Sequence, residues 1–317
     1  MDLGALGQFG FLTLPNYSMI ACANAIEALR MANRVSARNV YRWQLLTLDG
    51  APARASNGMS LHPTAALGST RALDVVFVCG GVDIRRSTGR SLLAALRRLS
   101  REQIVLGALC TGTFALAEAG LLSGYRCAIH WENLGAIREE FPDIHFLDDL
   151  YAIDRDRITC TGGIAPLDLM LTLIRARLGH DIAERIASQF ILERGRRASE
   201  RQPLLPVVPA GASHERLEMA LRLIQSRLDE RLRTSTIAAA AGLSTRQLER
   251  LFKRHLGQTP AVLWKRLRLE RARALLTQTA MPITDVSIAC GFSTAAHFAT
   301  AYRHQFGCTP STQRATS

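Results

Sequence analysis

Several patterns that mark common classes of protein are missing from this chain. Its seven cysteines include no C-x-x-C pair, and its eight histidines form no cluster with metal-ligand spacing. We therefore expect reduced thiols in a cytoplasm, without a disulfide framework or a bound metal. No apolar run approaches about 18 residues and no charged-then-apolar leader opens the chain, so we expect neither secretion nor membrane insertion. The glycine-rich turns form no P-loop or dinucleotide fingerprint, and we expect no cofactor.

Acidic residues are sparse in the last third of the chain. Residues 214–317 hold 16 Lys and Arg against 7 Asp and Glu, a net charge of +9 out of the total of +12. The first 213 residues hold the remaining 23 basic and 20 acidic residues, a net charge of only +3. This concentration of positive charge is typical of a domain that faces the phosphates of nucleic acid.

The basic segment contains one pattern twice, fifty positions apart. Apolar residues recur at offsets 0, +3, +4 and +8, which is one face of a helix, and a Gly and then a Pro follow. A short helical segment and a glycine turn precede each copy, which predicts two helix-turn-helix motifs. A helical packing repeat is the alternative, but solenoids need about three or more copies. The matched residues are Leu248, Leu251, Phe252, Leu256, Gly257, Thr259 and Pro260, and Phe298, Ala301, Tyr302, Phe306, Gly307, Thr309 and Pro310.

The two predicted reading helices share a buried face and differ on the opposite face. Arg and Gln near the start of the first can make bidentate contacts to guanine and adenine, and its later basic residues suit phosphates. The second is alanine-rich, so we expect backbone contacts, methyl contacts and shape readout from it. For any one of these residues a solvated surface is the alternative. The predicted DNA-contacting residues are Ser244, Arg246, Gln247, Glu249, Arg250, Lys253 and Arg254, with Thr294, Ala295, Ala296, His297, Thr300 and Arg303.

Residues 214–317 resemble the DNA-binding domain of the AraC/XylS family of bacterial transcription regulators. The resemblance rests on Ala241-Gly242-Leu243-Ser244, on Gly291-Phe292-Ser293, and on Phe306-Gly307 with Thr309-Pro310. It implies sequence-specific binding to double-stranded promoter DNA, with RNA polymerase as a further candidate partner. Thr300 departs from the pattern, because the family often has Arg there. A long helix predicted over about residues 261–277 separates the two motifs and can be buried on both sides.

The first two thirds of the chain predict an α/β fold. Short apolar runs at residues 8–14, 43–48, 74–79 and 104–109 alternate with helical stretches near residues 19–35, 91–99, 113–119 and 132–141. Such alternation is typical of a parallel sheet covered by helices on both faces, here a flavodoxin-like sandwich. Residues 194–211 then turn to Arg, Ser, Gln and three prolines, which favours an interdomain linker.

Cys110 lies where a predicted strand opens directly into a helix, which is the pattern of a nucleophile elbow. The helix N-terminus should lower the pKa of that thiol. Residues 8–192 resemble the PfpI-like, class I glutamine-amidotransferase-like superfamily, and their fusion to an AraC-type domain resembles the GlxA-type regulators. This implies a sensing and dimerising domain over residues 1–192, a linker over 193–213 and an all-α DNA-binding domain over 214–317. The helix-turn-helix motifs then span residues 234–255 and 283–306, and the protein is expected to be a homodimer.

Catalysis is not expected from Cys110 and His130. Active members of that superfamily generally place an acid beside the cysteine, yet no carboxylate follows the first strand before Glu27. The elbow is then vestigial, and it either lines a ligand pocket or simply packs in a tight turn. The alternative is a Cys110-dependent hydrolase or hydratase fused to a DNA-binding domain. We expect Asp168 to cap or brace the helix that follows it.

The first two elements also resemble regulators of arginine, carnitine and glycine-betaine catabolism. This implies an activator of a catabolic operon that responds to a small amine, betaine or amino acid. Aromatic side chains such as Tyr17 and Trp131 could hold an alkylammonium group, with Glu132 or Glu27 as counter-charge. The predicted ligand-binding residues are Asn16, Tyr17, Glu27, Gly81, Cys110, Thr111, His130, Trp131 and Glu132.

Overall fold

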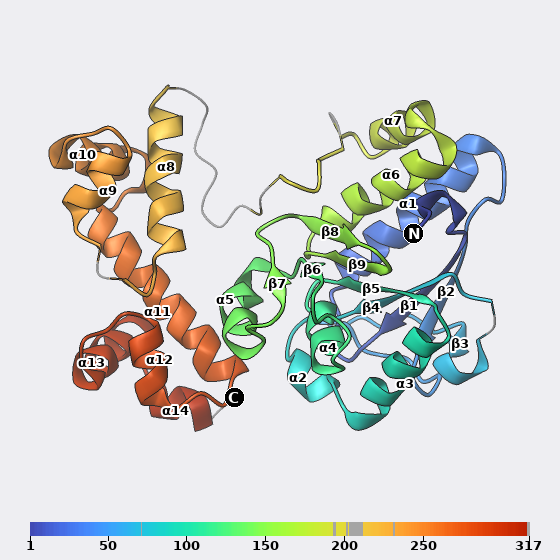
Figure 1. Cartoon of the computed structure of the whole chain (residues 1–317), viewed down its shortest axis with the longest axis horizontal. Helices are drawn as coiled ribbons and strands as arrows, with labels where there is room; N and C mark the ends of the chain where they lie inside the picture. Colours follow the sequence, from blue (N-terminus) through green and yellow to red (C-terminus); the bar gives the residue numbers. More distant parts are fainter. Residues whose placement is uncertain (71, 193–194, 201, 203–211, 231, 316–317) are drawn as a thin grey trace. The chain divides into compact units, whose positions relative to one another are not determined.

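The computed structural model describes residues 1–70, 72–192, 195–200, 202, 212–230 and 232–315. The chain divides into two compact units, Met1–Gln202 and Pro203–Ser317 (Figure 1). The first unit is α/β and the second is all-α, so the predicted fold class is confirmed. Most of the linker expected over residues 193–213 lies outside the described residues, but residues 195–200 and 202 are described and belong to the first unit.

A seven-stranded sheet forms the centre of the first unit. Its strand order is β3-β2-β1-β4-β5-β9-β8, and all neighbours are parallel except β8 and β9. A separate parallel pair joins β6 and β7. The strands are β1 (Gln8–Thr13), β2 (Arg42–Thr47), β3 (Ala65–Ala66), β4 (Val75–Cys79), β5 (Val105–Leu109), β6 (Arg126–Cys127), β7 (His145–Phe146), β8 (Tyr151–Asp154) and β9 (Arg157–Cys160).

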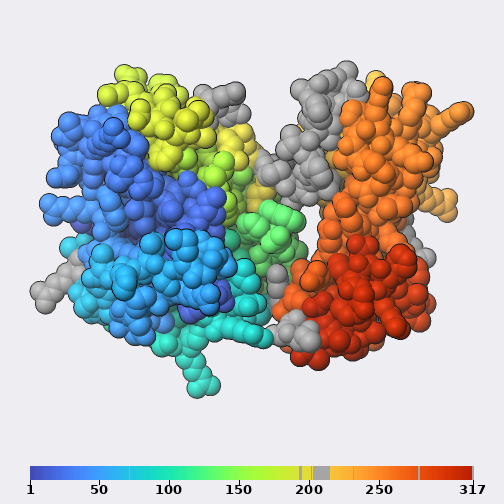
Figure 2. All heavy atoms as spheres, turned by 180° about the vertical axis from the view of Figure 1, so that it is seen from behind, coloured from blue at the N-terminus to red at the C-terminus, as the bar shows by residue number. Residues whose placement is uncertain are grey.

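Helices cover both faces of this sheet. Residues of α1, α6 and α7 bury one face, while residues of α2, α3, α4 and α5 bury the other. Figure 2 shows the atoms of α6 and α7 (yellow-green) lying against those of the N-terminal segment (blue), and α6 contacts both α1 and the 3-10 turn Leu3–Ala5. The helices are α1 (Met19–Ser36), α2 (Ile84–Ser87), α3 (Arg90–Arg101), α4 (Gly112–Glu118), α5 (Trp131–Glu140), α6 (Ala165–Leu178) and α7 (His180–Gln189).

Burial on both faces explains why the strands are almost continuously apolar. Successive side chains of β4 alternate between the two cores, so Phe77 faces α1 while Val76 and Val78 face the opposite layer. Phe77 stacks on Phe9 and Phe11 of β1, with ring centroids 6.3 and 5.8 Å away. These apolar strands hold their carboxyl ends at one edge of the sheet, where the elbow lies.

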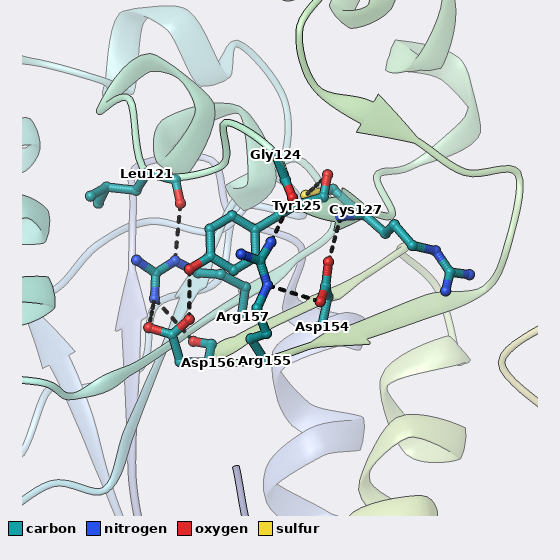
Figure 3. Close-up of polar contacts among 9 residues, drawn as sticks. Leu121, Gly124, Tyr125, Cys127, Asp154, Arg155, Asp156 and Arg157 are labelled. Carbon is teal, nitrogen blue, oxygen red and sulfur yellow. Dashed lines mark hydrogen bonds and ion pairs between the residues drawn. The ribbon is translucent and has the colours of Figure 1, made fainter.

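The strands β7 to β9 were not predicted from the sequence pattern, and a polar cluster joins β8 and β9 to the residues around β6. Tyr125 lies between the guanidinium groups of Arg155 and Arg157, which are 3.7 and 5.1 Å from its ring centroid (Figure 3). The backbone amide of Ala128 donates to Oγ1 of Thr159 at 2.8 Å. The short strands therefore fix the position of the loop that leads into α5.

Where the structure describes it, at residues 212–230 and 232–315, the second unit contains helices and no strand. Two small aromatic and aliphatic cores lie under its two helix pairs, one around Phe252 and the other around Phe298 and Tyr302. Within the described residues, no helix is long and apolar enough to cross a membrane. The helices are α8 (Ala212–Ser226), α9 (Thr234–Ala240), α10 (Thr245–Leu256), α11 (Pro260–Gln278), α12 (Ile283–Ala289), α13 (Ala295–Phe306) and α14 (Pro310–Ala315).

Helix α11 joins the two halves of this unit, as predicted. It contacts α8 and α10 on one side and α12, α13 and α14 on the other. The Arg268 guanidinium lies 4.9 Å from the Trp264 ring and 4.3 Å from the Phe292 ring, and its Nε donates to the carbonyl of Cys290. Arg268 of α11 thus attaches the second motif to the long helix that follows the first motif.

Candidate functional site

The first candidate reading helix, α10, begins with a capping box. Oγ of Ser244 accepts from the amide of Gln247 at 3.3 Å, and Oε1 of Gln247 accepts from the amide of Ser244 at 2.9 Å. Leu248 and Phe252 are fully buried on the inner face. The helix ends at Gly257, whose φ of 67° is the left-handed conformation that glycine adopts most easily.

The outer face of α10 carries a row of exposed polar side chains. Arg246, Arg250 and Lys253 make no ion pair with any described residue, so their charges are not neutralised within that part of the chain. Two uses of Gln247 compete, however, because its Oε1 already closes the capping box. A bidentate contact to adenine needs both amide atoms, so while the cap is intact it must use the second lone pair of that oxygen together with Nε2. The exposed predicted residues are Ser244, Arg246, Gln247, Glu249, Arg250, Lys253 and Arg254.

The second candidate reading helix, α13, repeats the backbone but not the surface. Thr294 caps it by accepting from the amide of His297 at 3.2 Å, and Gly307 ends it with a φ of 75°. The hydroxyl of Thr300 donates to the carbonyl of Ala296 in its own helix at 3.0 Å. The exposed predicted residues are Thr294, Ala295, Ala296, His297, Thr300 and Arg303.

In the first unit, the elbow predicted at Cys110 has the expected backbone. Cys110 follows β5 directly, is separated from α4 by Thr111 alone and has a φ of 59°. Neighbouring loops approach each other closely at this place. A Cβ atom built on Gly81 would lie 2.0 Å from the carbonyl oxygen of Asn16. Thr111 is buried and its hydroxyl donates to the carbonyl of Gly81 at 2.7 Å. Asn16, Gly81, Cys110 and Thr111 therefore meet at one edge of the sheet.

His130 lies at the same edge. A Cβ atom built on Gly162 would lie 2.6 Å from Cδ2 of His130 and 3.1 Å from Sγ of Cys110. The thiol and the imidazole thus both border Gly162, and only a residue without a side chain fits there. Nδ1 of His130 is 3.7 Å from a carboxylate oxygen of Glu132.

The prediction of a lowered thiol pKa is wrong. Burial raises the pKa of Cys110 to about 11, and the backbone amide of Thr111 opposes this only in part. Burial also lowers the pKa of His130, against the attraction of the Glu132 carboxylate. At neutral pH the pair is a thiol and a neutral imidazole, because both groups are held away from water. Such a thiol is a poor nucleophile.

Two of the predicted ligand residues do not present their side chains at this edge. Tyr17 is fully buried, and its hydroxyl donates to Sδ of Met19 at 3.6 Å, so its ring packs in the core and presents no aromatic surface. Burial raises the pKa of Tyr17 to about 12. Glu27 lies about 12 Å along α1 from the start of that helix, at 1.5 Å per residue. It pairs with Arg30 at 2.6 Å on the helix surface.

An apolar rim at this edge includes the predicted Trp131, and its other three residues were missed from the sequence. Ile20, Val82, Trp131 and Ile164 each follow the carboxyl end of a strand or open the next helix, and they are between 40% and 59% exposed. Single exposed apolar residues carry no signal in a sequence, and only the fold brings four of them to one edge. The exposed carboxylate of Glu132 adds a negative charge beside Trp131.

Asp168 does not cap or brace its own helix. It is 3% exposed, and its carboxylate accepts from the backbone amide of Arg196 at 2.7 Å and from the guanidinium of Arg196 at 2.9 and 2.7 Å. The prediction is therefore corrected, because Asp168 binds Arg196 of the segment that follows α7. Two surface hollows of ≈ 530 and ≈ 210 Å³ also lie in the first unit, and neither is lined by Cys110 or His130.

Comparison with known proteins assigns both units to families. The helix-turn-helix domain model matches residues 237–316, and the DJ-1/PfpI family model matches residues 20–176. The HTH-type transcriptional regulator GbdR of Pseudomonas aeruginosa is 42% identical over 97% of this chain and 84% of its own length. The HTH-type transcriptional regulator GlxA of Rhizobium meliloti is 33% identical over 97% and 95%. The predicted resemblance to GlxA-type AraC regulators is confirmed.

The enzyme alternative has weaker support. Isonitrile hydratase of Pseudomonas putida is 28% identical over only 58% of this chain and 77% of its own length. A crystal structure of an AraC family transcriptional regulator from Pseudomonas putida is also 28% identical, with a TM-score of 0.53 over 58% of this chain and 99% of that one. The relatives that match nearly the whole chain are named as transcriptional regulators and not as enzymes.

Proposed function

This chain belongs to the HTH-type transcriptional regulators of the GlxA kind in the AraC family, and from that premise we propose how its two units divide the work. The second unit binds promoter DNA through α10 and α13. The first unit binds a small zwitterionic amine, betaine or amino acid and forms a homodimer. The protein activates a catabolic operon, contacts RNA polymerase there, and works in the cytoplasm because its DNA target lies there.

The capped and unneutralised outer face of α10 carries the DNA-binding proposal. Arg246 and Arg250 lie one helical turn apart on the exposed face, and the buried Leu248 and Phe252 fix that face outward. Arg residues near the start of a reading helix suit bidentate contacts to guanine, while Lys253 and Arg254 further along suit phosphates. The alanine-rich face of α13 then contributes contacts to the backbone and to thymine methyl groups.

Titration of the full-length protein on a promoter fragment tests this assignment. Replacing Arg246 and Arg250 together by Ala should weaken binding, by about 1–3 kcal/mol for each lost base contact. Arg227 lies outside both motifs and pairs with Glu230, so Arg227→Ala is the matched control and should leave affinity unchanged. Promoter binding that survives the double substitution would remove α10 from the reading role.

The apolar rim with its adjacent carboxylate carries the proposal for the ligand. Trp131 presents an exposed aromatic face, Val82 and Ile164 present aliphatic surface, and Glu132 supplies a negative charge. An aromatic face beside a carboxylate is the environment that attracts a quaternary ammonium or a protonated amine. The inert Cys110 thiol and the neutral His130 imidazole add no competing positive charge at this edge.

Thermal shift of the full-length protein tests the ligand class. Saturating glycine betaine, carnitine or arginine should raise the melting temperature, because a ligand that binds only the native state stabilises it. Trp131→Ala and Glu132→Gln should each reduce that rise, whereas Glu27→Gln should not. A wild-type protein that shows no shift with any of the three compounds would rule out this ligand class.

A further inference from the structure

A short segment after α7 is held on the first unit at two places. We call residues 195–200 and 202 the strap. At its start, the ion pair and amide bond between Arg196 and Asp168 fix it to the first turn of α6. At its end, Nε2 of Gln202 donates to the carbonyls of Ile129 at 3.0 Å and Asp149 at 3.4 Å. Gln202 is only 5% exposed, which is rare for a glutamine outside a core.

Backbone hydrogen bonds fix the middle of the strap. The amide of Leu150 donates to the carbonyls of Ala198 at 3.0 Å and Glu200 at 3.2 Å, and the amide of Gln202 donates to Asp148 at 3.1 Å. The strap thus extends the sheet region at the start of β8, with no strand of its own.

Three anchors of the strap, Ile129, Leu150 and Asp168, connect to the candidate ligand edge. Ile129, which Gln202 binds, immediately precedes His130. Leu150, which binds the strap, accepts from the amide of Thr161 at 2.9 Å, and Thr161 immediately precedes Gly162. Asp168 lies in the helix that opens directly after the Gly162 turn. A ligand that moves His130 or Gly162 therefore acts on the groups that hold the strap.

The strap also leads into the second unit. Gln202 is the last residue of the first unit, and the next residue along the chain begins the second. Release of residues 195–202 would let the connection reach further, by at most about 3.3–3.6 Å for each residue freed. The buried Oε1 of Gln202 has no partner among the described residues, so the docked strap leaves one acceptor unsatisfied. An unsatisfied buried acceptor makes the docked state easier to shift.

We propose that ligand binding at the His130–Gly162 edge changes how firmly the strap docks on the first unit. Through this change the strap transmits the ligand signal to the DNA-binding unit. This rests on the sensing function proposed above. Coupling between two equilibria is reciprocal. If the ligand changes strap docking by some factor, then release of the strap by substitution changes ligand affinity by the same factor.

Hydrogen exchange of the full-length protein tests the docking. Arg196→Met and Gln202→Ala should each speed exchange of the Leu150 and Gln202 amides by about tenfold or more, because each removes hydrogen bonds that hold the strap. Arg197 is exposed, and no contact of its side chain is found among the described residues, so Arg197→Met is the matched control. Gln202→Ala leaves no buried charge unpaired, which keeps the test valid if Arg196→Met does not fold.

A promoter reporter tests the coupling, at matched protein abundance with and without saturating glycine betaine. Both strap variants should change the ratio of output with and without the compound, while Arg197→Met should not. If the wild type ignores glycine betaine, carnitine and arginine, the ligand proposal fails, and the strap is judged on basal output alone. The proposal is overturned if the Leu150 and Gln202 amides stay protected in both variants. It is also overturned if these amides exchange faster while basal and induced output stay unchanged.

Discussion

The two helix-turn-helix copies have the same buried face and different outer faces. Leu248 and Phe252 in α10 are fully buried, and so are Phe298 and Tyr302 at the matching positions of α13, fifty residues further on. Arg246 and Arg250 on the first are matched by Ala296 and Thr300 on the second, and the Thr300 hydroxyl is already bonded to its own helix. The comparison teaches that packing constrains only one face of a helix, so a repeated motif can keep its fold while its outer surface changes use.

The largest expected effect tests the shared buried face. Phe252→Ala and Phe298→Ala should each destabilise the second unit by about 3–5 kcal/mol, because each leaves a cavity in a packed core. Urea unfolding followed by Trp264 fluorescence, in a Trp43→Phe and Trp131→Phe background, measures both. Arg250→Ala is the exposed control. A loss confined to one of the two variants would contradict the equivalence of the buried faces.

The next effect tests the difference between the outer faces. Arg246→Ala should lower discrimination between operator and scrambled DNA by about 1–3 kcal/mol, because a base contact is lost. Arg303→Ala in the second copy should weaken binding to both DNAs equally and reduce the salt slope by about 1, as expected for a phosphate contact. Titrations at several salt concentrations separate the two. Equal loss of discrimination in both variants would remove the asymmetry.

A smaller effect compares the two caps. Ser244 and Gln247 bond reciprocally, whereas Thr294 makes one cap bond. Ser244→Ala should therefore cost somewhat more than Thr294→Ala, with each near about 1 kcal/mol. The Trp264 unfolding measurement applies again, and Ser244→Asp, which keeps a capping oxygen, should retain most of the stability. A larger loss from Thr294→Ala would reverse the ranking.

The smallest effect is expected at the elbow, another motif kept in shape without its usual chemistry. Because burial raises the pKa of Cys110 to about 11, iodoacetamide should leave it unmodified near neutral pH and react only as the pH approaches that value in the folded protein. Mass spectrometry of the labelled peptides measures this, with the partly exposed Cys308 as the internal comparison. Rapid labelling of Cys110 at neutral pH would show that the thiol is reactive.

Much of the fold could be predicted because periodicity depends on neighbours along the chain. The apolar runs of β1, β2, β4 and β5 and the stripe of α10 carry their own pattern, as does the capping box at Ser244. The strands β8 and β9 are four residues each and include charged residues such as Arg157. Their stability comes from partners distant in sequence, including Tyr125, so no local pattern marks them.

The candidate ligand edge could be predicted only in part. The elbow motif correctly places Cys110 beside Thr111 and Gly81, since a strand, a tight turn and a helix follow one another along the chain. The pKa of its thiol depends on burial from several elements at once, and there the local argument about the helix N-terminus is wrong. The partnership of Asp168 with Arg196 joins residues 28 positions apart. No spacing rule identifies such a pair.

The sequence alone predicts the two-unit α/β plus all-α organisation, the tandem motifs, the outer residues of both reading helices and the family. These depend on composition, periodicity and short motifs, which are properties of consecutive residues. Only the folded structure shows that Tyr17 is buried, that Glu27 lies away from the elbow and that the strap ends beside His130. Those outcomes depend on which distant surfaces exclude water together, and burial of that kind is a property of the folded chain.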